Sequence, residues 1–407
     1  MSNALSHITV LDLSRVLAGP WAGQVLADLG AEVIKIERPG IGDDTRSWGP
    51  PFLRNERGDD SADAAYYLCA NRNKKSVTVD FTTAEGQAIV RDLARNCDVV
   101  LENFKVDGLK AYGLDYESLC GVNPALIYCS ITGFGQTGPY AARAGYDLLV
   151  QGMGGLMSIT GRAAGEPGAG PQKAGVAVTD ILSGLYATIG ILAALNHRDR
   201  TGVGQHIDVG LLDVQVACLA NQAMNYLVSG VAPRPAGNAH PNLVPYQDFP
   251  TSDGRVIIAV GNDAQFGRLC SVLTVAHLAE DARYLTNQKR VVNRAALIDA
   301  LSAATRLGTT AQWVAALEQV GVPAGPINTV DAVFADPQVV ARGMKFDMAH
   351  PVAGTVSLVA SPLRLSETPV SYRNPPPTLG AQTDEVLAGR LAMTVEKIAA
   401  LRARRVI

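Results

Sequence analysis

Two aspartates beside glycine-containing stretches are the residues of this sequence with the clearest chemical potential. Asp180 stands at the start of a long apolar segment, and Asp147 follows Gly145 and Tyr146. A carboxylate in the first turn of a helix stabilises that helix by about 1 kcal/mol, so capping alone would explain either residue. A carboxylate can also attack a thioester and form a mixed anhydride, which divides an acyl exchange into easier covalent steps. For Asp147 the pattern favours a cap, whereas for Asp180 both interpretations stay open.

Basic residues stand at two strand ends where an anion could bind. Arg38 ends a predicted strand, and an arginine at the carboxyl end of a parallel strand faces the crevice where α/β proteins bind ligands. Arg72, Lys74 and Lys75 precede the next predicted strand, and together with Arg38 they could hold a phosphate. A solvated rim charge and an ordinary surface turn explain the same residues without a ligand.

Several common sites lack their sequence signals. We recognise neither a G-x-G-x-x-G nor a G-x-x-x-x-G-K-[ST] pattern in the chain, and the turn at 14–20 cannot make the usual phosphate cradle, so a nicotinamide-linked dehydrogenase or a P-loop enzyme is not expected. No two histidines are spaced i, i+4 and none lies beside a cysteine, so we predict no metal site. The serine elbow G-x-S-x-G of a hydrolase is also missing.

Composition restricts the class of protein. The chain has 407 residues, of which 47% are apolar and 18% charged, with a formal net charge of −3. This is enough apolar sequence for a large core and about two or three domains. The balanced charge does not predict a nucleic-acid partner. Small molecules are the expected ligands.

The expected compartment is the cytoplasm. Six cysteines are scattered without a C-x-x-C pair, which fits a reducing environment, and the N-terminus lacks the pattern of a secretory leader. The longest apolar stretch, 181–195, is shorter than the roughly 20 residues that cross a bilayer, so we interpret it as a buried helix and expect no membrane association.

Short β-branched runs alternate with amphipathic segments, which predicts an α/β fold with a parallel sheet and crossover helices. Strands are expected at 8–13, 33–37, 77–80, 99–102, 126–131 and 205–209. Helices are expected at 20–29, 83–96, 179–196 and 211–228. Glycine and proline are frequent from residue 230 onward, so a linker is expected there. A small α+β domain is expected at 230–330, with a hairpin formed by 246–249 and 256–260. The helices expected in this domain are 264–274, 292–305 and 310–320. Two further helices are expected at 383–391 and 395–403.

The chain resembles a known family along nearly its whole length. The stretches that carry the resemblance, in order, include LDLSRVLAGPWAGQVLADLGAEVIKIERPG, NRNKKSVTVDF, VLENF, ITGFGQTGP, RAGYD, GLMSITG, VAVTDILSGLYA, VPAGPINT and PPPTLGAQTDEVL. They are similar to class III CoA-transferases of the CaiB/BaiF type, and most of all to the members that act on C4 to C6 dicarboxylic acids, the succinyl-CoA:glutarate type.

The resemblance implies a fold and an assembly. A large Rossmann-like domain would be built from both chain ends, residues 1–229 and 331–407, with the small domain at 230–330 between them. Two subunits would be threaded through each other as an interlocked homodimer. The nucleophilic aspartate of the family matches Asp180, so the resemblance favours the nucleophile over the cap.

The resemblance also implies the residues that bind CoA. They are Val16, Leu17, Ala18, Arg38, Lys75, Asn103, Phe104 and, in an approximate register, Lys110. Where some relatives carry a lysine, this chain has Thr132, so a phosphate contact is not carried over to that position. The run of glycines that closes the site in formyl-CoA transferases is missing, which makes oxalate a poor substrate prediction.

The implied activity is transfer of CoA from an acyl-CoA, expected to be succinyl-CoA, to a dicarboxylic acid through aspartyl anhydride and aspartyl-CoA intermediates, with no tightly bound cofactor. Arg46 and then Arg72 are the candidates for the far carboxylate of the acid. Backbone N–H groups near 135–138 or at the start of the Asp180 helix are expected to stabilise the oxyanion.

Two other functions remain as alternatives. α-Methylacyl-CoA racemases share the fold but have histidine where this chain has Tyr146, and a tyrosine of ordinary pKa near 10 is a poor base at neutral pH. A non-catalytic CoA-binding protein would not need Asp180.

Overall fold

The computed structural model describes residues 3–407 and divides the chain into two compact units. The first unit is drawn from the chain up to Leu156, from Ala174–Ser229 and from Gln338–Ile407. The second consists of Met157–Lys173 and Gly230–Pro337. Each unit has a hydrophobic core of its own, as the clusters of buried side chains show.

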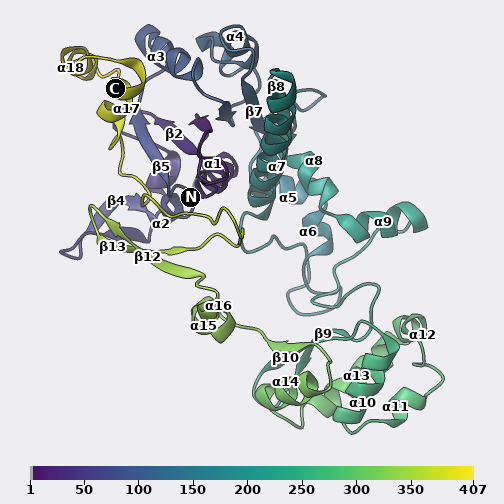
Figure 1. Cartoon of the computed structure of the whole chain (residues 1–407). Helices are drawn as coiled ribbons and strands as arrows, with labels where there is room; N and C mark the ends of the chain where they lie inside the picture. The colour runs from purple at the N-terminus through teal and green to yellow at the C-terminus, as the bar shows by residue number, and fades with distance from the viewer. Residues whose placement is uncertain (1–2) are drawn as a thin grey trace. The chain divides into compact units, whose positions relative to one another are not determined.

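A six-stranded parallel sheet forms the centre of the first unit, in the order β5-β2-β1-β6-β7-β8 (Figure 1). The strands are β1 (Thr9–Asp12), β2 (Glu32–Glu37), β5 (Lys74–Thr78), β6 (Val99–Glu102), β7 (Ile127–Thr132) and β8 (Gln205–Gly210). The predicted α/β class and parallel sheet are confirmed. The strand order reverses between β1 and β6, and α/β proteins bind ligands beyond the carboxyl ends of the strands at such a reversal.

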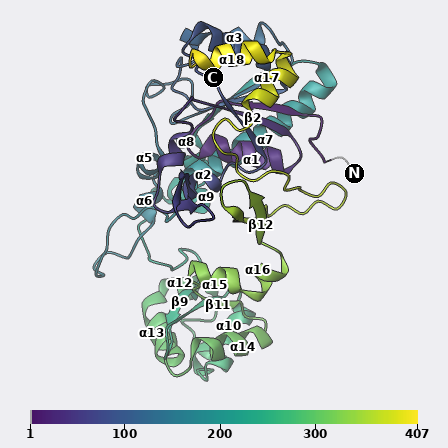
Figure 2. The same cartoon turned by 90° about the vertical axis from the view of Figure 1, so that its left-hand side faces the viewer.

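Helices cover both faces of this sheet. On one face α1 (Ala18–Asp28) and α7 (Val178–Thr201) pack against buried residues such as Val10, Val33 and Leu101. On the other face lie α3 (Ala84–Ala94) and the C-terminal helices α17 (Thr383–Leu391) and α18 (Val395–Ala403), beside α3 in both views (Figures 1 and 2). The last helices of the chain therefore complete the core that the first strands begin.

The other elements of the first unit are shorter. Its helices are α2 (Ala65–Leu68), α4 (Tyr116–Cys120), α5 (Asp147–Met153), α8 (Leu211–Ala217) and α9 (Ala220–Ser229), with 3₁₀ turns at Asp44–Ser47 and Lys110–Tyr112. Two antiparallel hairpins that the sequence pattern did not predict are β3 (Phe52–Arg54) with β4 (Asp60–Ala64) and β12 (Lys345–His350) with β13 (Gly354–Val359). Along the chain, the first unit ends and the second begins within the short helix α6 (Leu156–Ile159).

The second unit contains the predicted hairpin, β9 (Tyr246–Pro250) and β10 (Arg255–Ala259), which β11 (Ala324–Pro326) extends to three antiparallel strands. Helices pack against it around a core that includes Phe249, Phe266 and Leu301. They are α10 (Asp263–Val272), α11 (His277–Glu280), α12 (Asn287–Val292), α13 (Arg294–Thr305) and α14 (Thr310–Gln319). Two short helices follow along the chain, α15 (Val330–Ala335) and α16 (Pro337–Ala341).

Three expectations about single elements were wrong. The strand expected at 77–80 instead runs from Lys74 to Thr78. The charge of Lys74 suggested a surface turn, but its ammonium group is buried and bound within the protein. The helix expected at 211–228 breaks between α8 and α9, where Ala220 adopts φ +45°. The helix containing 181–195 is only half buried: α7 is long and apolar enough to cross a membrane, but half of its most apolar window packs inside the protein.

Helices α1 and α7 cross at a glycine. A Cβ atom on Gly184 of α7 would lie 2.6 Å from the carbonyl oxygen of Ala18 and 3.1 Å from the Cβ of Trp21. The absence of a side chain thus lets the second turn of α7 approach the start of α1 closely.

Replacing Gly184 by alanine is expected to destabilise the protein. The new methyl group must push α1 and α7 apart, and such overpacking costs about 1–3 kcal/mol. Gly389→Ala in α17 is the matched control, because no atom lies within 4 Å of its added Cβ, and there a gain of about 0.5–1 kcal/mol is expected from helix propensity. Urea unfolding of both variants checks this, and equal effects of the two substitutions would contradict the close crossing.

Candidate functional site

A cavity of about 470 Å³ opens at the point where the strand order reverses. It is lined by the turn after β1, which includes Val16 and Leu17, by Asn103 and Phe104 after β6, and by Asp180 of α7. The carboxyl edge of the sheet therefore brings together segments that are far apart in the sequence. These include several of the predicted CoA-binding residues and the predicted nucleophile.

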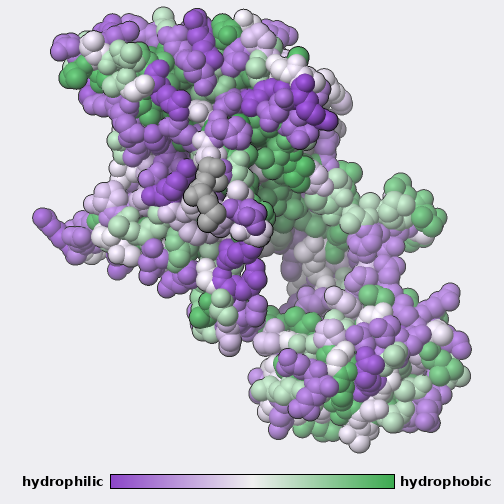
Figure 3. Space-filling model, viewed as in Figure 1, coloured by the Kyte–Doolittle hydropathy of each residue, from purple (hydrophilic) through white to green (hydrophobic). Residues whose placement is uncertain are grey.

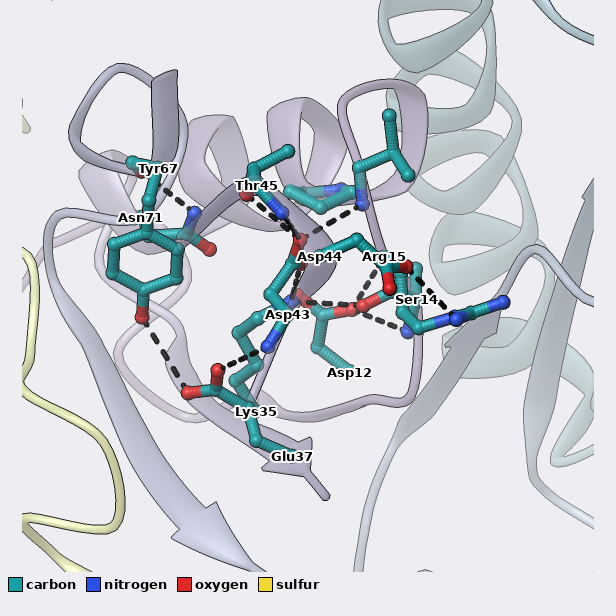
Figure 4. A network of polar contacts seen from close by, with 12 residues as sticks. Asp12, Ser14, Arg15, Lys35, Glu37, Asp43, Asp44, Thr45, Tyr67 and Asn71 are labelled. Atoms are coloured by element: carbon teal, nitrogen blue, oxygen red, sulfur yellow. Dashed lines mark hydrogen bonds and ion pairs between the residues drawn. The ribbon is translucent and has the colours of Figure 1, made fainter. Parts of the chain in front are cut away.

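A buried network of charges supports the turn after β1 (Figure 4). The Lys35 ammonium group lies 2.9 Å from the Asp43 carboxylate, with both side chains fully buried, and it donates to the main-chain oxygen of Ser14 at 2.8 Å. Lys74 contacts Asp12 at 3.0 Å, and Asp12 accepts a hydrogen bond from the N–H of Ser14. Burial alone would raise the pKa of Asp43, but Lys35 and hydrogen bonds from Thr45 outweigh burial and lower the pKa to about 2. Asp43 is therefore ionised and fixed.

The turn itself is held in an unusual conformation. Val16 adopts φ +72°, in the left-handed region that β-branched residues rarely enter. The Val16 N–H donates to Asp43 at 3.2 Å. The side-chain amide of Asn103 fixes the backbone of Arg15, the residue before Val16. It accepts from the Arg15 main-chain N–H at 2.8 Å and donates to the Arg15 main-chain carbonyl at 2.6 Å. Strain of this kind persists only where the surroundings over-determine the backbone, and it is found mainly at functional sites.

Asp147 caps the helix that carries Asp180. One oxygen of the Asp147 carboxylate accepts hydrogen bonds from the N–H groups of Thr179 at 2.9 Å and of Asp180 at 3.4 Å. The other oxygen accepts from the Gln151 side chain at 2.6 Å, and Gln151 in turn accepts from the N–H of Ala174. Asp147 is the first residue of α5, but the N-cap of that helix is Tyr146 and no side chain caps it, so the prediction that Asp147 caps the following helix was wrong. The Asp147 carboxylate caps α7 instead.

The surroundings of Asp180 favour the protonated, uncharged form of its carboxyl group. Burial raises its pKa, the negative charge of Asp147 raises it further, and the resulting pKa is about 7. The hydroxyl of Tyr66 in α2 is affected in turn, because burial and then the charge of Asp180 raise its pKa to about 12. A carboxylate of near-neutral pKa is more basic, and hence a stronger nucleophile, than an ordinary aspartate.

Other predicted residues lie outside the Asp180 cavity. Arg38 is exposed and lines a neighbouring cavity of about 410 Å³ that shares Arg15 and Phe104 with the first. Lys75 lies in the amino-terminal half of β5 and pairs with Glu32 at 2.9 Å and Glu385 at 2.7 Å. Lys110 lines a small pocket. The cation that follows Phe104 in the main cavity is Lys105, which the sequence reasoning missed.

The two arginines expected to bind a substrate carboxylate are buried in ion pairs. Arg46 forms ion pairs with Glu37 at 2.7 Å and with Asp63 at 2.5 Å. Arg72 donates two hydrogen bonds to the Asp28 carboxylate, one to each oxygen, at 2.5 and 3.0 Å. Both side chains are more than nine-tenths buried. Their charge is compensated inside the protein, so the geometry gives no support to either as a substrate contact.

Four of the expected oxyanion donors are likewise occupied. The N–H of Gly135 donates to Thr132, that of Gln136 donates to Asp208, and those of Thr179 and Asp180 donate to Asp147. The expectation that the chain has no G-x-G-x-x-G pattern was wrong, because residues 133–138 form one after β7. No helix begins until Asp147, so this string does not form the strand-turn-helix of a dinucleotide site.

Comparisons with known proteins agree with one another. The family model "CoA-transferase family III" matches residues 5–383. The chain is 55% identical to the succinate–glutarate CoA-transferase of Agrobacterium fabrum, over 94% of this chain and 95% of that protein. It is 46% identical to the succinyl-CoA:glutarate CoA-transferase of Homo sapiens, over 94% of this chain and 85% of that one. A CAIB/BAIF family protein from Brucella suis has a similar crystal structure, with a TM-score of 0.84, 52% identity and coverage of 96% of this chain and 100% of that chain.

The raised pKa of Asp180 predicts how stability depends on pH. Because the folded-state pKa of about 7 exceeds the ordinary 3.8, folding takes up a proton between these values, and the free energy of unfolding falls as pH rises through that window. Asp180→Asn removes this contribution. Denaturant unfolding at pH 5 and pH 8 is therefore expected to show the variant gaining stability relative to wild type at the higher pH.

Asp147→Asn serves as the matched control. It keeps an oxygen that can accept from Thr179 but removes the repelling charge, so the pH dependence assigned to Asp180 is expected to move to lower pH. A stability difference between Asp180→Asn and wild type that does not change with pH would contradict the assignment.

Proposed function

The chain belongs to CoA-transferase family III, and on that premise we propose that it moves CoA from succinyl-CoA to glutarate or another C4 to C6 dicarboxylic acid, with Asp180 as the nucleophile. The names of the relatives support this donor and acceptor. The observation that carries the proposal is a carboxyl of pKa about 7 at the start of a 24-residue helix, lining the large cavity at the sheet reversal.

In the first half-reaction the Asp180 carboxylate attacks the thioester carbonyl of succinyl-CoA. The carbon–sulfur bond breaks, CoA leaves as the thiolate, and a succinyl-aspartyl anhydride remains. The thiolate then attacks the Asp180 carbonyl, which releases succinate and forms an aspartyl-CoA thioester. Dividing the exchange in this way replaces one difficult step by two easier ones.

The second half-reaction reverses this order with the acceptor. The acceptor carboxylate attacks the aspartyl-CoA thioester, giving a second anhydride and the thiolate again. Attack of the thiolate on the acceptor carbonyl yields the new acyl-CoA and free Asp180. One thioester is exchanged for another without net proton or electron transfer, so this scheme needs no tightly bound cofactor.

Each tetrahedral step develops an oxyanion, for which we assign the N–H groups of Leu17 and Ala18. Both residues line the Asp180 cavity at the start of α1. In the part of the chain that the structure describes, neither N–H has an acceptor, and the positive end of a helix favours developing negative charge. The buried Lys35–Asp43 pair would fix these donors through Val16.

CoA itself would occupy the main cavity and the adjoining one. Val16, Leu17, Ala18, Asn103 and Phe104 line the first. Arg38 lines the second, so the two together offer room for a long ligand. Lys105 takes the role first considered for Lys110, while the ion pairs of Lys75 with Glu32 and Glu385 suit it to holding the C-terminal segment against the sheet.

An unpartnered apolar surface supports the proposal of a homodimer. Tyr186 and Ile189 of α7 are 46% and 61% exposed, and Leu227 and Val228 of α9 are 70% and 81% exposed. Figure 3 shows hydrophobic side chains gathered over these helices. Apolar surface of this kind marks association sites, and a second copy of the chain is the partner that the family resemblance implies. The six free cysteines support a cytoplasmic location.

The nucleophile assignment predicts the outcome of a CoA-exchange assay. Wild-type protein given succinyl-CoA and a panel of glutarate, itaconate, mesaconate, malate, oxalate and butyrate is expected to form new dicarboxyl-CoA thioesters, detected by mass spectrometry. Asp180→Asn is expected to lose at least about 10³-fold in rate, because the covalent route is removed.

A parallel measurement separates the racemase alternative. Epimerisation of a 2-methylacyl-CoA by wild-type protein, without exchange to any acid, would overturn the transferase proposal. It would assign Asp180 to proton transfer instead. Neither activity in a folded protein that still binds CoA would leave the non-catalytic alternative.

A further inference from the structure

A dicarboxylate bound at Asp180 requires a cation for its far carboxylate, and the structure offers few. Three basic residues line the Asp180 cavity: Arg15, Lys105 and Arg143. Arg15 is paired with Asp44 at 2.8 Å. For Lys105 and Arg143, the described part of the chain supplies no ion pair.

Arg143 is held in place by aromatic rings instead of by a carboxylate. Its guanidinium carbon lies 4.5 Å from the centre of the Tyr140 ring and 5.2 Å from that of Phe134, and these two rings pack edge to face. The main-chain N–H of Arg143 also donates to the main-chain carbonyl of Tyr140 at 2.9 Å, which closes a tight turn. A stacked guanidinium keeps its in-plane N–H groups available, so it can bind a carboxylate with two parallel hydrogen bonds.

The backbone connects this cation to the nucleophile. Arg143 lies four residues before Asp147, whose carboxylate accepts from the N–H of Asp180. Between them, Gly145 packs so closely on Gly133 that a Cβ on either would lie within 2.6 Å of the other backbone. The segment that caps the Asp180 helix is thus also the one that carries Arg143 into the cavity.

Resting on the proposed function, we propose that Arg143 is the specificity residue that binds the far carboxylate of the dicarboxylate, both in the donor acyl group and in the acceptor. Lys105 follows Phe104 in the CoA-binding segment, and its flexible point charge suits the phosphates of CoA. Because an arginine side chain can follow a ligand that is one methylene longer or shorter, the site selects for the second charge more than for chain length.

The test compares two acceptors of one shape, glutarate and its monoamide glutaramate, with succinyl-CoA as the donor. The ratio of their kcat/KM values cancels effects on the donor half-reaction. Wild type is expected to prefer glutarate by about 100-fold, since a charge-assisted bidentate contact is lost with the amide. In Arg143→Met the ratio is expected to fall to near 1, and in Arg143→Lys it is expected to be intermediate.

Lys105→Met is the matched control, because it removes a cation from the same cavity. It is expected to raise the KM for succinyl-CoA while leaving the glutarate-to-glutaramate ratio unchanged. A folded Arg143→Met protein that keeps the wild-type ratio would overturn the assignment of Arg143 and leave the proposed transferase intact. Failure of wild type to transfer CoA to any acid would instead overturn the proposed function on which the inference rests.

Discussion

The buried ion pair between Lys35 and Asp43 is the interaction on which the geometry of the site depends. Two charges without solvent contact are expensive to bury, and only a close, fully hydrogen-bonded arrangement compensates for this. Here the arrangement binds the turn after β1 from two sides, through the carbonyl of Ser14 and the N–H of Val16. The energy of the network is thereby used to hold Val16 in a backbone conformation that its side chain disfavours.

Opposing electrostatic effects meet at Asp180. The first turn of a long helix lowers the free energy of a carboxylate. Burial and the neighbouring charge of Asp147 raise that free energy by more, and the pKa of Asp180 is therefore near 7. Asp147 also takes up the N–H groups that would otherwise stabilise Asp180. The cap thus orients the Asp180 helix and keeps its carboxylate reactive at the same time, and the glycine crossing at Gly184 brings α1 beside it.

Periodicity predicted the sheet and its principal helices, because β-branched runs and amphipathic segments report burial directly. It failed where charge is buried: Lys74 was interpreted as part of a surface turn and Arg46 as a substrate contact, yet tertiary ion pairs place both in the interior. Asp180 and Val16, which the resemblance named, line one cavity. Arg143 and Lys105 were missed because an exposed cation has no local signal, and only the folded chain shows which cations lack a carboxylate partner.

The central claim, that Asp180 forms a covalent thioester with CoA, is tested most directly by trapping. Wild-type protein is mixed with succinyl-CoA and no acceptor, treated with borohydride, digested and examined by mass spectrometry. The account predicts that residue 180 is found as homoserine, the product of reducing an aspartyl thioester, and only when succinyl-CoA was present. An unchanged aspartate at 180 in a protein that still exchanges CoA would contradict it.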